Sequence, residues 1–182
     1  RQVFDGPEAV RMILLNEGVL FAVQTLIRKR LADQRQPLFA PALGGGMDLD
    51  TLIDLIGRSK FGFVHKNLAF TRIHEDSVTS KEAVLQSRAL TRYCLYLLTH
   101  YGPAAFGHQY QEQLKRFRRY YVRRILRWGR EVEDVAHIES HKQAIEQAGW
   151  RFGPVLMADA IVDWVLIRLG FRSAWTGFPG WE

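Results

Sequence analysis

Two acidic residues follow a run of three glycines in the first third of the chain. Residues 44–46 are glycine, and Asp48 and Asp50 come directly after Met47. Glycine lets the backbone adopt positive φ and approach a ligand closely, and the apolar spacing beyond Asp50 predicts a helix over residues 51–56. A carboxylate at the mouth of that helix could take a proton from an attacking hydroxyl group. Alternatively, Asp50 simply caps the helix. Asp48 and Asp50 cannot both be the cap, so one of the two carboxylates remains available for another role.

A second polar segment, residues 71–77, carries an arginine and a histidine two residues apart. If the preceding strand continues, Arg72 and His74 project from the same side of it. An arginine offers a bidentate fork to a diphosphate, and a histidine can donate a hydrogen bond or bind a metal. The alternative interpretation is a polar turn between a strand and a helix.

In this order and at this spacing, the two segments resemble family 2 glycosyltransferases of the inverting GT-A type. Residues 23–80 are similar to the second half of that catalytic domain. Residues 24–30 correspond to a segment that ends in an arginine-rich turn, and residues 46–53 to a loop that leads into an acidic helix. The most specific part is the phrase Arg-x-His-x-x-Ser-x-Thr at residues 72–79.

The resemblance implies a role for each of these residues. Asp48 falls at the position of the catalytic base that deprotonates the acceptor hydroxyl. Arg72 and His74 fall in the stretch that closes over the donor diphosphate and its divalent metal, Mn²⁺ or Mg²⁺, with His74 as a metal ligand. The sequence departs from the family at Met47, which replaces an acid, and at Asp54, where a basic residue is common. The acceptor loop would comprise Gly45, Gly46 and Asp50.

The same resemblance sets the expected architecture and function. We expect an α+β, predominantly helical chain. Residues 1–80 would form the acceptor-side part of a Rossmann-like GT-A domain, and residues 81–182 a helical extension. The nucleotide-binding half is not visible, because the only Asp-x-Asp motif is residues 48–50. The intact enzyme would transfer a sugar from a nucleotide-diphosphate donor to a hydroxyl acceptor with inversion, in cell-surface polysaccharide or glycolipid synthesis. This part alone would be inactive.

Periodicity and turn residues place the individual elements. Asp5 and Pro7 predict a helix start, and Gly18 its end. Thr79 and Glu82 form a capping box that opens a helix over 81–100, which Gly102-Pro103 should break. Strands are expected at 19–27 and 61–70, and further helices at 109–128, 132–148 and 155–169.

The positive charge of the chain is concentrated in one segment. The formal net charge is +6, and residues 115–130 hold eight lysines and arginines with no acid. Three interpretations compete: an ordinary packed helix with solvated arginines, a contact with anionic lipid, and a nucleic-acid contact, which no accompanying motif supports. A membrane or acidic-partner contact would use Arg116, Arg119, Arg123 and Arg127. A stripe at helical spacing runs through Leu114, Phe117, Tyr121, Ile125 and Trp128.

Composition excludes several protein classes. With 182 residues, 47% of them hydrophobic, the chain can form a substantial core. The single cysteine, Cys94, excludes a disulfide framework and is expected in the core. His137 and His141 lie four apart on a helix, but no third ligand is evident and a surface helix is expected. We expect a cytoplasmic protein peripheral to the inner face of the membrane, where lipid-linked acceptors occur. The competing class is a non-catalytic helical adaptor that docks through residues 115–130.

Overall fold

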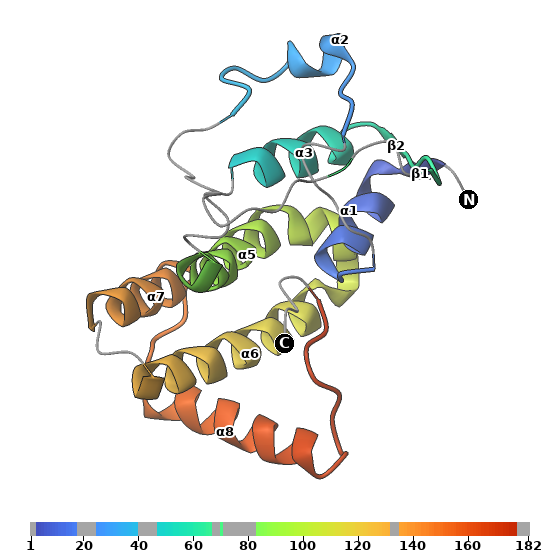
Figure 1. Ribbon diagram of the computed structural model, residues 1–182. Helices are drawn as coiled ribbons and strands as arrows, with labels where there is room; N and C mark the ends of the chain where they lie inside the picture. The colour runs from blue at the N-terminus through green and yellow to red at the C-terminus, as the bar shows by residue number, and fades with distance from the viewer. Residues whose placement is uncertain are drawn as a thin grey trace.

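The protein is predominantly helical with one small two-stranded sheet (Figure 1). This computed structural model describes residues 3–17, 25–39, 47–66, 70, 83–131 and 135–177. The N-terminal elements are β1 Val3–Asp5, α1 Gly6–Leu14, α2 Lys29–Ala32, α3 Met47–Gly57 and β2 Lys60–Gly62. The later elements are α5 Ala83–Phe106, η3 Gly107–Gln109, α6 Tyr110–Glu131, α7 Val135–Gln147 and α8 Pro154–Arg168. The α+β, predominantly helical expectation is confirmed at this level.

The sheet joins two helix–strand units in the N-terminal part. β1 pairs antiparallel with β2, with Phe4 opposite Phe61. Because α1 starts directly after β1 and α3 ends just before β2, the two helices are brought together at one end of the sheet. Gly6 lies at the contact: a Cβ atom there would come within 2.4 Å of the Ile56 carbonyl oxygen. Only glycine lets the start of α1 approach the end of α3 this closely.

A single hydrophobic cluster connects the N-terminal helices with the C-terminal ones. It contains buried residues on both sides of the boundary predicted near residue 80, from α1, α3, α5, α6, α7 and α8. The segment after α8 runs back toward the start of the chain, where Trp175 packs edge-on against Phe117, 5.4 Å between ring centroids. Gly177 then lies against the carbonyl of Leu14. The tail therefore links α6 to α1.

The prediction that Gly102-Pro103 ends the long helix is wrong. α5 continues through both residues to Phe106, and the chain turns at Gly107, whose φ is +51°. Pro103 removes one helical hydrogen bond. A Cβ on Gly102 would lie 2.8 Å from the ring of Tyr110 in α6. The absence of a side chain at residue 102 thus serves the packing of α5 against Tyr110 and does not end the helix.

Some of the other predicted helices and strands are confirmed, and others are shorter than predicted or lie outside the described residues. The helix after Asp5 is confirmed as α1, although the Asp5 side chain makes no capping hydrogen bond and the left-handed residue after the helix is Asn16. The helices at 109–128 and 155–169 are confirmed as α6 and α8. The predicted strand at 61–70 is short, since β2 ends at Gly62 and residues 63–66 are irregular. Residues 25–28 are also irregular, and the rest of the strand predicted at 19–27 and the capping box lie outside the described residues.

Candidate functional site

The acids predicted for catalysis lie in the first turn of α3, but they face different surroundings. α3 begins at Met47, four residues earlier than predicted, and Thr51 Oγ1 donates a 2.9 Å hydrogen bond to the Met47 carbonyl. Asp50 therefore lies inside the helix and is not its cap, so that interpretation is wrong. Residues two apart on a helix point about 200° apart. Asp50 is accordingly buried, whereas Asp48 is half-buried.

Asp50 belongs to a buried ion-pair network. Its carboxylate accepts hydrogen bonds from Arg35 and from the Tyr101 hydroxyl, the latter at 2.8 Å. Arg35 also donates to Asp54 at 3.1 Å, and Arg58 donates to Asp54 at 2.9 Å. We call these five residues the α3 network. The expectation that Asp50 belongs to an open acceptor loop is corrected here, because its carboxylate is only 2% exposed and its partners hold it in place.

The α3 network shifts the pKa values of Arg35 and Tyr101. Burial works against the charged guanidinium of Arg35, but the hydrogen bond and attraction to Asp50 exceed it, so the pKa of Arg35 is raised above its usual range. Burial, followed by the hydrogen bond and negative charge of Asp50, raises the pKa of the Tyr101 hydroxyl. Arg35 therefore stays charged and Tyr101 stays protonated throughout the physiological range. Both groups act as fixed donors to Asp50.

Asp48 differs from Asp50 and Asp54, the other two acids of α3, in its hydrogen-bond partners. Its Oδ1 accepts a 2.7 Å hydrogen bond from the backbone N–H of Leu49, and it makes no ion pair within the described part of the chain. The unpaired N–H groups and dipole at a helix N-terminus favour a negative charge in the first turn. Asp48 is thus the α3 carboxylate that keeps access to solvent.

The structure does not describe the remaining predicted donor-side and loop residues. Gly45, Gly46, Arg72 and His74 lie outside the described residues. Among the residues that are described, no group of three histidine, cysteine, aspartate or glutamate side chains could hold a metal ion. A Mn²⁺ or Mg²⁺ site therefore rests on the resemblance alone.

Three arginines of α6 form ion pairs with aspartates of α8. Arg119 is buried and donates to Asp159 at 3.1 Å, Arg118 reaches the same carboxylate at 3.1 Å, and Arg123 pairs with Asp163. The hydrogen bond to Asp159 raises the pKa of Arg119. For Asp159, burial is outweighed by Arg119 and Arg118, and its pKa is lowered. We call these five residues, with Arg172 on Asp163 at 3.0 Å, the α6–α8 network.

The predicted four-arginine contact surface is corrected accordingly. Arg119 and Arg123 point at α8, because the two aspartates of α8 lie four residues apart on the face that packs against α6. Arg116 lies near the tail, its Nη2 3.3 Å from the Ala174 carbonyl oxygen, and Arg127 is exposed. The aromatic stripe is confirmed as core: Phe117, Tyr121, Ile125 and Trp128 are all buried.

The histidine expected on a surface helix is also a core residue. His141 is fully buried, and its Nδ1 lies 2.6 Å from the Tyr121 hydroxyl. The expectation of a surface position is wrong for His141, because the tyrosine satisfies a ring nitrogen that would otherwise need water. The side chain of His137 lies outside the description. Cys94 is buried as predicted, and burial raises the pKa of its thiol.

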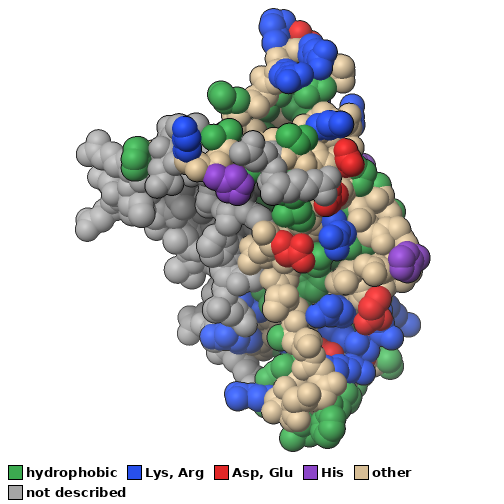
Figure 2. All heavy atoms as spheres, turned by 90° about the vertical axis from the view of Figure 1, so that its right-hand side faces the viewer, with side chains coloured by type: hydrophobic (Ala, Val, Ile, Leu, Met, Phe, Trp, Pro, Cys, Tyr) green, Lys and Arg blue, Asp and Glu red, His purple; other side chains and the backbone are tan. Residues whose placement is uncertain are grey.

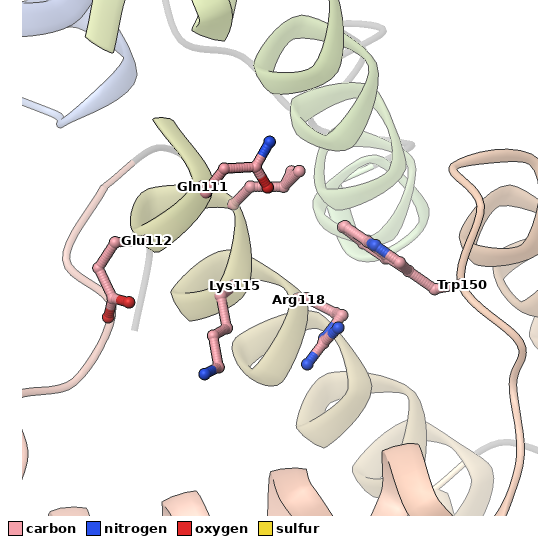
Figure 3. Close-up of a pocket in the computed structure, with 6 residues that line it drawn as sticks. Gln111, Glu112, Lys115, Arg118 and Trp150 are labelled. Atoms are coloured by element: carbon pink, nitrogen blue, oxygen red, sulfur yellow. The ribbon is translucent and has the colours of Figure 1, made fainter. Parts of the chain in front are cut away.

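Two grooves open along the first half of α6, away from α3. One, of about 380 Å³, has Arg118 and Trp150 facing each other, the guanidinium 5.7 Å from the ring centroid (Figure 3). The other, of about 440 Å³, is lined with cations from α6 and the tail, among them Lys115, Arg116 and Arg172. Neither groove contains Asp48, so the acid and the grooves are separate features.

Sequence reasoning missed the partners of the α3 acids. Arg35 lies in an irregular polar stretch, and Tyr101 is 51 residues from Asp50 along the chain. The one available signal was the i, i+4 spacing of Asp50 and Asp54, which places both acids on one helix face. Comparison with known proteins adds no identity, since no family model, no curated protein and no solved structure matches the chain.

Proposed function

We propose that this chain is the acceptor-side part of an inverting nucleotide-sugar glycosyltransferase, with Asp48 as the general base. The observation that carries the proposal is that the three aspartates of α3 differ in their partners. Asp50 and Asp54 pair with Arg35 and Arg58, whereas Asp48 remains half-buried at the helix start without a described cation. The resemblance of residues 23–80 to family 2 enzymes supports the same assignment.

In this mechanism Asp48 takes the proton of an acceptor hydroxyl as its oxygen attacks the anomeric carbon of the donor sugar. The bond from that carbon to the diphosphate breaks on the opposite face, and the configuration inverts. A base within hydrogen-bond reach of the hydroxyl contributes typically 10²–10⁴-fold to the rate. Arg72 and His74 would hold the leaving diphosphate. A bound divalent metal would supply further positive charge there.

The α3 network gives Asp48 a fixed position. Arg35 and Tyr101 hold Asp50 from two different parts of the chain, and Thr51 ties the first turn to the Leu38 carbonyl at 2.6 Å. The helix turn that follows Asp48 is therefore held by two contacts, one at Asp50 and one at Thr51. Such support is what a catalytic group requires, because small displacements reduce proton-transfer efficiency.

The test compares Asp48→Asn with Asp33→Asn in the full-length protein encoded by the gene. Asp33 is an exposed acid that pairs only locally, with Lys29 at 2.7 Å. Each protein is incubated with a hydroxyl acceptor and one of three donors, UDP-glucose, UDP-N-acetylglucosamine or GDP-mannose. Sugar transfer is measured by the release of the nucleoside diphosphate. We expect Asp48→Asn to lose transfer by at least about 100-fold and to retain donor binding. Asp33→Asn should match the parent.

The competing function is a non-catalytic adaptor that binds an acidic partner through residues 115–130. In that case no sugar is transferred by the parent protein, and Asp48→Asn changes nothing. The internal pairing of Arg119 and Arg123 with α8 reduces the charge available for such a partner.

A further inference from the structure

The outward face of α8 is apolar and uncovered in the described structure. α8 packs on α6 through Leu156, Ala160 and its two aspartates. The opposite side of the helix and the residues just after it expose large hydrophobic side chains, from 40% to 85%. They are Val155, Ile161, Val162, Trp164, Val165, Leu169 and Phe171. Contiguous exposed apolar surface of this kind marks a binding face.

Charge on α8 is sorted between its two faces. Both acidic residues of the helix, Asp159 and Asp163, point inward to the arginines of α6. The outer face therefore carries no negative charge. It does carry Arg168, whose guanidinium lies 5.6 Å from the ring centroid of Trp164.

More cations lie beside this face. Arg172, four residues after the end of α8, lines the groove of about 440 Å³ together with Lys115 and Arg116. The groove also contains Glu112 and Asp163, and Asp163 pairs with Arg172. Figure 2 shows hydrophobic side chains at the lower end of the molecule and a group of Lys and Arg side chains above them. Figure 1 places α8 at that end. Apolar surface and positive charge thus adjoin each other.

We propose that the outer face of α8 docks on the surface of an anionic lipid bilayer. Trp and Phe side chains with adjoining arginines favour the headgroup region, where the apolar part enters the acyl boundary and the cations meet anionic lipids. With 15 residues, α8 is about 22 Å long, shorter than the ~30 Å hydrocarbon core. No helix in the described ranges combines the length and apolarity needed to cross a membrane. α8 would therefore lie in the interfacial plane.

Charge complementarity favours lipid over a second copy of this chain. A two-fold dimer through α8 would place the same surface on both sides of the interface. Arg168 would then face a surface with the same positive charge and no acid on the outer face of α8 to neutralise it, whereas Arg172 already pairs with Asp163. An anionic bilayer supplies the missing negative charge. The proposal moves the membrane contact predicted for α6 to α8, and it is independent of the role of Asp48.

The first test measures co-sedimentation with vesicles of phosphatidylcholine alone and with 30% phosphatidylglycerol. The variant Ile161→Asp/Val165→Asp puts two acids on the outer face. The control Leu26→Asp/Val64→Asp makes the same kind of change at two exposed apolar residues away from α8. We expect the parent and control to bind the anionic vesicles, and the α8 variant to bind at least tenfold more weakly. Circular dichroism and urea unfolding check that all three are folded.

The second test removes charge without touching the apolar face. Arg168 is exposed and its guanidinium lies over the Trp164 ring, so Arg168→Gln should preserve the fold. Loss of one cation near an anionic surface should weaken binding about fivefold, and 0.5 M salt should weaken it further. Binding to neutral vesicles should not respond to either change.

Three results would overturn the proposal. The parent could bind neither kind of vesicle, or the α8 variant could bind as well as the parent. Alternatively, light scattering could find a dimer of the parent that the α8 variant abolishes, without lipid binding, in which case the occupant is a second copy.

Discussion

Two partly buried ion-pair networks in the described part of the protein use the same spacing of acids. They differ in what they leave exposed on their helices. Each rests on two aspartates four residues apart on one helix, Asp50 and Asp54 on α3 and Asp159 and Asp163 on α8. In the α3 network Arg35 and Arg58 pair with two acids, and a third acid on the helix, Asp48, has no ion pair among the described residues. In the α6–α8 network the acids neutralise arginines and leave an apolar outer face. Asp48 and the apolar outer face of α8, which the two networks do not involve, are therefore available for catalysis and for binding.

The comparison also shows which charges are structural. The α3 network joins α3 to Arg35 before it and to Tyr101 of α5, whereas the α6–α8 network joins two neighbouring helices along their length. Removing one partner of a buried pair leaves an uncompensated charge, which costs far more than losing a solvated pair. The following variants use this difference to test the comparison.

The largest effect is expected for Arg35→Ala. Arg35 is the shared partner of Asp50 and Asp54, and its side chain is 15% exposed. Its loss leaves the 2%-exposed Asp50 carboxylate with the Tyr101 hydroxyl as its described donor. We expect the free energy of unfolding to fall by about 3–5 kcal/mol, measured by urea denaturation. Lys29→Ala, which removes an exposed i, i+4 pair, should change it by less than about 0.5 kcal/mol. Similar losses in both variants would contradict a buried network.

Gly6→Ala should have the next largest effect. The added Cβ would lie within 2.7 Å of three carbonyl oxygens at the end of α3, and backbone atoms there cannot move aside without shifting the helix. Overpacking of this kind costs about 1–3 kcal/mol. The matched control is Gly129→Ala in α6, where nothing lies within 4 Å of the new atom. That change should stabilise the helix by about 0.5–1 kcal/mol. Thermal unfolding of both variants should show opposite signs.

Arg123→Ala tests the network between α6 and α8. Arg123 pairs with the buried carboxylate of Asp163, which keeps Arg172 as a partner after the substitution. We therefore expect a smaller loss than at Arg35, about 1–2 kcal/mol. The control is Lys115→Ala, at an exposed position in the first half of α6, with a change within about 0.5 kcal/mol. Equal effects would mean that α6 presents a uniform basic face to solvent, as the sequence suggested.

The sequence predicted the helices well where an apolar stripe or a continuous apolar run was present. α6 and α8 appear where expected, and the stripe from Phe117 to Trp128 is buried. Predictions failed where the answer depends on a distant contact. α5 continues past Pro103 and Gly102 packs against Tyr110, while Asp50 is buried and held by Arg35 and Tyr101. No local pattern encodes such partners, so spacing could locate the candidate acids but could not separate Asp48 from Asp50.

The smallest expected effect is a pH dependence that distinguishes Asp159 from an ordinary surface acid. The pKa of Asp159 is lowered in the folded protein, because its attraction to Arg119 and Arg118 outweighs its burial. A carboxyl group with a depressed folded pKa contributes stability that is fully present above its unfolded pKa, about 3.9. That contribution is lost as the pH falls through the lower, folded value. The stability lost between pH 6 and pH 3 should therefore be smaller in Asp159→Asn than in the parent protein, measured by urea unfolding at each pH. Asp33→Asn should lose as much as the parent, because Asp33 is exposed and pairs only with Lys29. If all three proteins lose the same stability, the carboxylate of Asp159 does not hold α8 against α6, and the inward sorting of acid on α8 would lose its energetic basis.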